Sequence, residues 1–134
     1  MAYFGKEFKF EKEENYEEFI KSISAADETA AVFLTFKPNY KIDKKGDEYV
    51  MTLTNGDFKK EISFKPGVAF EEDMSTGLKP TTVFTVDGDT FTQVQDYGSK
   101  GKITLKREFS ANQFKLTITS SKWDGVAYRY YVPA

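Results

Sequence analysis

Two arginines are the residues of this sequence whose type and spacing most suggest chemistry. Among 19 lysines and arginines, only Arg107 and Arg129 are arginine. Successive side chains of a strand point to opposite faces, so Arg107 falls on an apolar face while Lys106 falls on the other. The apolar residues that share the face of Arg107 are Ile103, Leu105 and Phe109. We therefore predict that Arg107 points into the interior of the protein.

The alternation around Arg129 is less decisive. Ala127 and Tyr131 share its face, but Tyr128 and Tyr130 place aromatic rings on the opposite face as well. An arginine that points inward keeps its charge, and the loss of its hydration costs on the order of several kcal/mol. A partner must offset that cost.

Two kinds of partner are open for these arginines. One is internal: a buried Asp or Glu, or carbonyl groups and water. The other is a ligand carboxylate, held by a guanidinium and by the hydroxyl of Tyr131. Two inward arginines on neighbouring C-terminal strands, with a tyrosine shortly after the second, favour the ligand.

Composition excludes most catalytic classes. The chain has no histidine and no cysteine, so a Ser-His-Asp triad, a thiol nucleophile and a zinc–thiolate site are impossible. It also lacks a Gly-x-Ser-x-Gly motif and a glycine-rich phosphate loop. A barrel enzyme with a carboxylate base stays formally open, but we expect a binding protein with no metal and no cofactor. The net charge of −2 argues against a nucleic-acid partner.

Strands must position these residues. Turn signals built on Gly, Asp, Asn and Pro recur about every 10 to 13 residues, and the segments between them are β-branched and aromatic. We count about nine strands from residue 38 onward, and residues 4–10 supply a tenth. The 134 residues suit a single domain. We predict an all-β fold, a ten-stranded antiparallel up-and-down β-barrel, because closure hides the sheet edges.

One segment, residues 15–36, departs from the strand pattern. Apolar residues recur there with the spacing of an amphipathic helix: Tyr16, Phe19, Ile20 and Ile23. Asn15 would cap this helix. A second short helix would start at Ser24 and Asp27 and end before Pro38. We predict a helix-turn-helix that caps the mouth of the barrel.

The size of such a barrel suggests a ligand. About eight strands enclose an interior that side chains just fill, so ten strands should leave a cavity. An apolar wall with one cationic spot suits a long-chain fatty acid, since each buried methylene contributes about 0.8 kcal/mol. A retinoid or another bulky anionic lipid is the alternative, because the sequence does not give the width of the cavity.

The N-terminus indicates the compartment. Lys6, Glu7 and Lys9 interrupt any apolar core of a signal peptide, and no stretch approaches the roughly 18 apolar residues of a membrane span. We expect a cytoplasmic protein. This argues against a secreted lipocalin-like carrier, as does the missing cysteine.

Several segments resemble the intracellular fatty acid-binding protein family, and together they span essentially the full chain. They are Phe8-Lys9-Phe10, Asn15-Tyr16-Glu17, Phe19-Ile20, Lys37-Pro38, Phe58-Lys59-Lys60-Glu61-Ile62, Gly67-Val68-Ala69-Phe70-Glu71-Glu72 and the terminal Arg129-Tyr130-Tyr131. The ending from Ile118 to Tyr131 is similar to midgut members from moths and other insects. Two segments depart from the family pattern: Lys6-Glu7-Phe8 replaces its Gly-x-Trp, and residues 73–79 diverge.

This resemblance implies a barrel of two near-orthogonal sheets, a β-clam, under a helical lid. It implies a non-enzymatic, monomeric carrier that takes long-chain fatty acids between membranes and enzymes and touches membrane surfaces transiently. Arg129 and Tyr131 would hold the carboxylate, with Arg107 as the second cationic site. The residues that would line the pocket or its portal are Tyr16, Phe19, Ile20 and Phe58.

Overall fold

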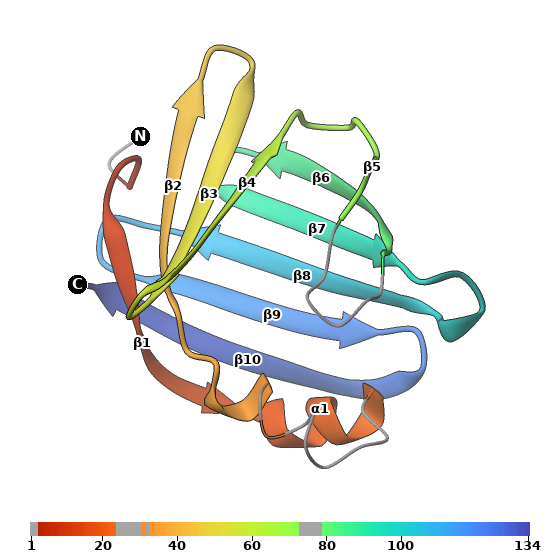
Figure 1. The fold of residues 1–134 in the computed structure, drawn as a ribbon. Helices are drawn as coiled ribbons and strands as arrows, with labels where there is room; N and C mark the ends of the chain where they lie inside the picture. The colour runs from red at the N-terminus through yellow and green to blue at the C-terminus, as the bar shows by residue number, and fades with distance from the viewer. Residues whose placement is uncertain (1–2, 24–30, 32, 73–78) are drawn as a thin grey trace.

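The computed structural model describes residues 3–23, 31, 33–72 and 79–134, and Figure 1 shows their fold. Ten antiparallel strands and one α-helix account for most of them. The strands are β1 (Glu7–Glu14), β2 (Asn39–Lys45), β3 (Glu48–Asn55), β4 (Phe58–Phe64), β5 (Phe70–Glu71), β6 (Thr81–Asp87), β7 (Thr90–Asp96), β8 (Lys102–Phe109), β9 (Phe114–Ser120) and β10 (Trp123–Pro133). The helix α1 spans Tyr16–Ile23, and a short 3-10 helix, η1, spans Gly98–Lys100.

The strands form one curled sheet in the order β4-β3-β2-β1-β10-β9-β8-β7-β6-β5. Each strand lies beside its neighbour in sequence, except that β10 pairs with β1 and that β4 and β5 form the two ends. In Figure 1, β2–β4 cross β6–β10 at a steep angle. The predicted up-and-down arrangement of ten antiparallel strands in two near-orthogonal halves is confirmed.

The hairpin turns explain the regular spacing of the strands. Three hairpins use a two-residue Gly-Asp loop, at residues 46–47, 56–57 and 88–89. A type II′ turn needs a positive φ at its first central residue, where glycine avoids strain. Gly46 and Gly56 have φ values of 64° and 61°, as this turn requires.

The predicted start of the first strand is wrong. We predicted a strand over residues 4–10, but β1 runs from Glu7 to Glu14. Residues 3–5 form a turn, and the Gly5 amide donates a 2.9 Å hydrogen bond to the Ile42 carbonyl. Further along, Phe10 pairs with Tyr131 and Lys12 with Tyr130, so the pairing skips one residue of β1. This β-bulge at Glu11 reverses which residues of β1 face inward after it.

The predicted first helix is confirmed in α1, which lies beside β10 (Figure 1). Tyr16, Phe19 and Ile20 are buried, whereas Ile23 is 40% exposed and falls outside the buried face. Asn15 starts the helix in a way that differs from the cap we expected. It has a φ of 57°, and its side-chain amide donates to the Val126 carbonyl of β10.

The second part of the lid is described only in its last residues. Residues 31 and 33–35 are helical, and Pro38 follows them as expected. The predicted start at Ser24 and Asp27 lies outside the described residues.

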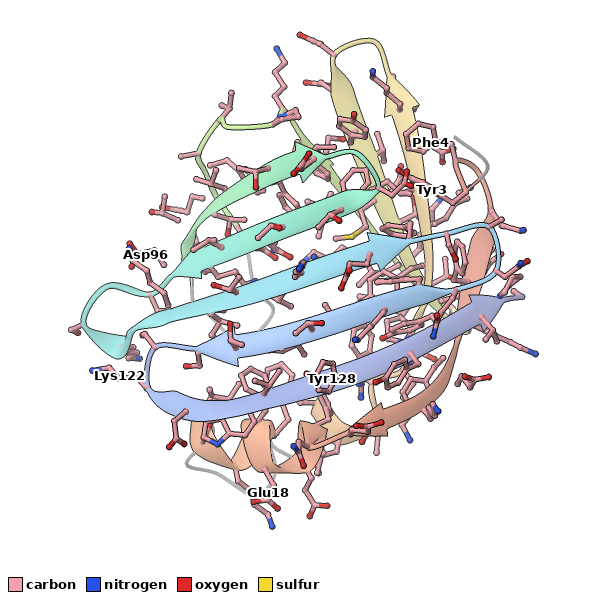
Figure 2. All side chains as sticks on the ribbon, turned by 180° about the vertical axis from the view of Figure 1, so that it is seen from behind. Tyr3, Phe4, Glu18, Asp96, Lys122 and Tyr128 are labelled. Atoms are coloured by element: carbon pink, nitrogen blue, oxygen red, sulfur yellow. The ribbon has the colours of Figure 1, made fainter. Side chains whose placement is uncertain are left out.

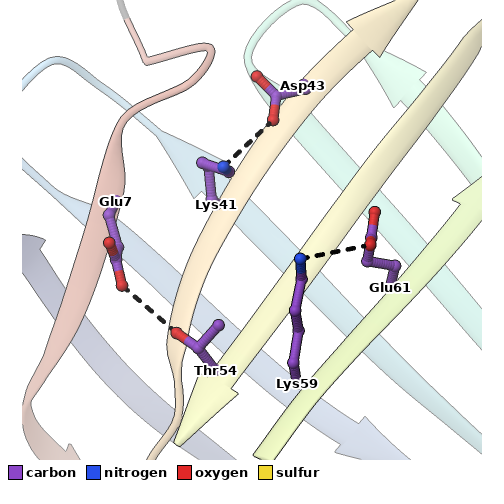
Figure 3. Close-up of polar contacts among 6 residues, drawn as sticks. All are labelled: Glu7, Lys41, Asp43, Thr54, Lys59 and Glu61. Atoms are coloured by element: carbon purple, nitrogen blue, oxygen red, sulfur yellow. Dashed lines mark hydrogen bonds and ion pairs between the residues drawn. The ribbon is translucent and has the colours of Figure 1, made fainter.

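The two faces of the sheet differ in character. Inward side chains form a core dominated by aromatic rings, with Phe8, Phe84 and Phe114 fully buried. On the outer face the polar side chains pair with one another: in Figure 3, Lys59 pairs with Glu61 at 3.6 Å. Figure 2 shows the outward side chains of β10 and α1, with Tyr128 and Glu18 labelled. None of the helices in the described part of the chain is long and apolar enough to cross a bilayer.

Candidate ligand-binding site

Three adjacent strands position the two arginines. On β9, Leu116 pairs with Arg107 of β8 on one side and with Arg129 of β10 on the other. Residues directly opposite each other on paired strands share a face, so both guanidinium groups point inward. Both arginines are 3% exposed, which confirms that they face the interior. We predicted that their strands are neighbours. This is wrong, because β9 lies between β8 and β10.

Arg129 is surrounded by three elements. Its Nη1 donates a 2.6 Å hydrogen bond to the Phe36 carbonyl, at the end of the lid. Its guanidinium carbon lies 3.7 Å from the centre of the Tyr16 ring at the start of α1. Its Nη2 lies 3.1 Å from Oε1 of Glu13 on β1. The lid and the N-terminal strand therefore meet at this one cation.

Arg107 joins a buried polar chain. Its Nη1 donates a 2.9 Å hydrogen bond to Oε1 of Gln93. The Gln93 amide nitrogen donates in turn to Oε1 of Glu72 at 2.8 Å. Glu72 is buried and sits just after β5, so Gln93 connects a buried cation to a buried anion.

Glu72 is well supplied with donors. Besides Gln93, its Oε1 accepts hydrogen bonds from Thr82 Oγ1 at 2.8 Å and from Gln95 Nε2 at 3.1 Å. Burial and the nearby Glu72 charge raise the pKa of Tyr97, which donates to Gln95, to about 12. A buried carboxylate that accepts several hydrogen bonds stays compatible with a dry interior.

Tyr131 completes the cationic site. It is fully buried, stacks on Phe114 and contacts Tyr40 edge to face. Tyr40 also lies beside the Arg107 guanidinium, 5.9 Å from its ring centre to the guanidinium carbon. Burial raises the pKa of Tyr131 well above its ordinary value of 10.0, although the charge of Arg129 opposes the shift. Its hydroxyl therefore stays protonated and can donate a hydrogen bond to an acceptor.

Several buried polar atoms of these residues have no well-formed hydrogen bond among the described residues. They are Nε of Arg107, Nε and Nη2 of Arg129 and the hydroxyl of Tyr131, although Nη2 lies in the ion pair with Glu13. Buried polar groups almost always have a partner, so a cluster of such donors from two cations and a phenol suits an anionic guest. A carboxylate has two oxygens that accept such bonds.

The other predicted residues divide into two groups. Tyr16, Phe19 and Ile20 are buried on the inner face of α1, and Phe19 packs against Trp123 with ring centres 5.8 Å apart. Phe58 is 45% exposed and meets Phe36 edge to face at 5.5 Å. The structure thus brings Tyr16 to Arg129 and leaves Phe58 at the surface near the end of the lid.

The sequence analysis missed Glu13 as a neighbour of the arginines. Counting every second residue from Phe8 and Phe10 places Glu13 on the outer face. The bulge at Glu11 inverts that count, and Glu13 pairs directly with Arg129. The sequence also does not show that Gln93 and Glu72 are hydrogen-bonding partners in the chain of contacts from Arg107, because these contacts join distant segments of the chain.

Comparisons with known proteins show which proteins the chain is similar to. No family model matches the chain. It is 45% identical over 131 residues to "Fatty acid-binding protein 1" of Manduca sexta, with 98% of each chain covered. It is 38% identical to "Fatty acid-binding protein 2" of the same insect, again with 98% of each covered.

Solved structures of similar proteins share the fold. A fatty acid-binding protein isolated from Manduca sexta matches with a TM-score of 0.88 and 39% identity, over 97% of this chain and 98% of that one. A brain fatty acid-binding protein of Drosophila melanogaster matches with a TM-score of 0.84 and 31% identity, over 97% and 98%. The resemblance noted in the sequence is confirmed, and so is the expectation of a binding protein rather than an enzyme. By identity over nearly its full length, the chain belongs to the fatty acid-binding protein family.

Proposed function

We propose that this protein is a carrier that reversibly binds one long-chain fatty acid inside the barrel. Arg129 and Tyr131 hold the carboxylate, and Arg107 is the second cationic site. The acyl chain lies among the aromatic side chains of the inner face. The observation that carries this proposal is the cluster of buried donors on these three residues that lack a well-formed hydrogen bond within the described part of the chain.

The charge balance of the interior supports an anion. Arg107, Arg129 and Glu72 are the buried charged residues among those described. Glu72 is connected to Arg107 through Gln93, whereas the carboxylate beside Arg129 is Glu13, whose side chain is 27% exposed. A ligand carboxylate in the place of Glu13 would neutralise Arg129, and a neutral lipid would not.

The lid and surface support transport. The hydrogen bond from Arg129 to the Phe36 carbonyl connects the carboxylate site to the end of the lid. Beside it, exposed Phe58 offers an apolar contact for a membrane surface. We propose that the protein acts as a cytoplasmic monomer of one domain, which meets membranes and enzymes transiently as it loads and releases its ligand.

The test is oleate binding by calorimetry after removal of bound lipid. Replacing Arg129→Leu should weaken binding by about tenfold to a hundredfold, the effect of losing one charge-assisted hydrogen-bonding partner. The matched control is Lys106→Leu, an exposed cation on β8, which should leave the affinity unchanged. Because Arg129→Leu also removes the donor to Phe36, Arg129→Gln serves as a second variant that keeps an N–H donor.

Three outcomes would contradict the proposal. They are equal losses in Arg129→Leu and Lys106→Leu, no loss in Arg129→Gln, and failure of the wild-type protein to bind oleate. Tighter binding of a retinoate than of oleate would instead favour a carrier for bulky anionic lipids.

A further inference from the structure

We propose that Glu13 is an internal competitor of the ligand, a carboxylate that neutralises Arg129 and is displaced when the fatty acid binds. This inference rests on the proposed function. It assigns to Glu13 a role in setting affinity and in selecting the ligand headgroup.

The position of Glu13 follows from the bulge in β1. After the bulge at Glu11, Glu13 lies directly opposite Arg129 and shares its inward face. Its Oε1 lies 3.1 Å from Arg129 Nη2, the shortest of the ion pairs between described residues. Arg129 is 3% exposed, whereas the Glu13 side chain is 27% exposed. The carboxylate thus sits between the interior cation and solvent.

The contact between Glu13 and Arg129 is close but poorly formed. Neither Glu13 Oε1 nor Arg129 Nη2 makes a hydrogen bond to a described residue, although both atoms are buried. An ion pair in the interior is favourable only when its geometry also satisfies the remaining donors and acceptors. This pair therefore neutralises charge without the hydrogen bonds that would hold it firmly.

The charge balance of the interior allows only one carboxylate at Arg129, either Glu13 or the ligand. With Glu13 in place, two guanidinium groups face two carboxylates, Glu72 and Glu13. A fatty acid would add a third negative charge to a low-dielectric interior, which is unfavourable. If Glu13 turns toward solvent, the ligand carboxylate takes its place and the balance is kept. Glu72 cannot make this exchange, because it is buried and accepts three hydrogen bonds.

Competition at Arg129 has a consequence for selectivity. Displacing Glu13 is compensated only by a headgroup that carries its own negative charge. An alcohol or an ester of the same chain length leaves Glu13 where it is. The affinity ratio between fatty acid and fatty alcohol therefore depends on Glu13.

The experiment measures binding of oleate and of oleyl alcohol to wild-type protein, to Glu13→Gln and to Glu14→Gln. Glu14 is exposed on the same strand, so Glu14→Gln removes the same charge without touching Arg129. Glu13→Gln should tighten oleate binding about tenfold and leave the affinity for oleyl alcohol unchanged, since it removes the competitor of a charged headgroup only. Glu14→Gln should match the wild type for both ligands.

Each alternative outcome has a distinct meaning. Oleate affinity that is unchanged or weaker in Glu13→Gln overturns the competition, as does an equal gain for acid and alcohol. Wild-type protein that binds neither ligand overturns the proposed function instead. If Glu13→Gln does not fold, Glu13→Asp keeps the charge but shortens the reach to Arg129, and it should show a smaller gain for oleate only. No gain in Glu13→Asp then counts against the proposal.

Discussion

At the residue scale, Arg129 connects the proposed carboxylate site to the lid. One guanidinium donates to the Phe36 carbonyl, faces the Tyr16 ring and pairs with Glu13. Arginine suits this position because its planar fork offers several donors while one face stacks on an aromatic ring. A lysine has three donors on a single nitrogen and no such plane. A ligand carboxylate bound at Arg129, as we propose, would therefore act on the lid at the same time.

The burial of Tyr131 can be tested by measuring how the stability of the protein changes at alkaline pH. Its pKa is raised in the folded protein by burial, so the unfolded chain ionises first as the pH passes the ordinary value of 10.0. Above that pH the unfolded state binds fewer protons than the folded state, and stability falls by at most about 1.4 kcal/mol per pH unit for this group. Tyr131→Phe should therefore lose less stability than the wild type between about pH 9 and about pH 11.

Urea unfolding at the two pH values measures this difference. Tyr128→Phe makes the same chemical change on the outer face of β10 and shows how much of the effect comes from the substitution alone. Identical pH slopes in wild type and Tyr131→Phe would contradict a pKa raised by burial.

At the residue scale, the sequence predicted some side-chain positions correctly and others not. The alternation of apolar and polar residues correctly predicted that Arg107 faces inward, and it was less decisive for Arg129, which also faces inward. It failed at Glu13, because a single bulge at Glu11 inverts the alternation. The sequence around Glu11 gives no sign of this bulge. It also left the internal and ligand partners of the arginines open. The structure shows internal partners for each arginine and, beside them, donors that remain for a ligand.

At the scale of elements, the only tryptophan of the chain lies where α1 packs on β10. Trp123 lies between Phe19 of α1 and Gly125 of its own strand. A Cβ added at Gly125 would lie 2.6 Å from Cε2 and 2.8 Å from Cη2 of the indole. Glycine is needed there because the ring covers the backbone.

Gly125→Ala should therefore push the indole away from α1. We expect a loss of about 1 to 3 kcal/mol in the free energy of unfolding, the usual cost of overpacking. We also expect a red shift of tryptophan fluorescence as the indole becomes more exposed. Asp124→Ala, at an exposed neighbouring position, is the control and should change neither quantity. An unshifted spectrum and unchanged stability in Gly125→Ala would show that the indole does not rest on this glycine.

At the scale of the whole molecule, the chain ends close the sheet. β1 and β10 pair along most of their length, and the Ala134 amide donates to the Glu7 carbonyl at 2.9 Å. In Figure 1, β1 and β10 lie side by side. The remaining edges, β4 and β5, do not pair with each other. The sheet is therefore continuous everywhere except between these two strands.

The whole-molecule arrangement was largely predictable, for a physical reason. Turn residues such as Gly46 and Gly56 end one strand and begin the next, so strand number and order follow from local sequence. The helical segment was equally visible, because its period differs from that of the strands. The exact bounds of β1 were not, since they depend on pairing with β10 at the far end of the chain.

The central claim concerns what the barrel carries, and native mass spectrometry tests it most directly. The purified protein is measured as isolated, then after delipidation, and again after addition of oleate, with organic extraction to identify any lipid that it held. The account predicts one fatty acid per chain, released unchanged on extraction and replaced by added oleate. A delipidated protein that takes up no oleate, or a bound lipid recovered only as a converted product, would contradict it.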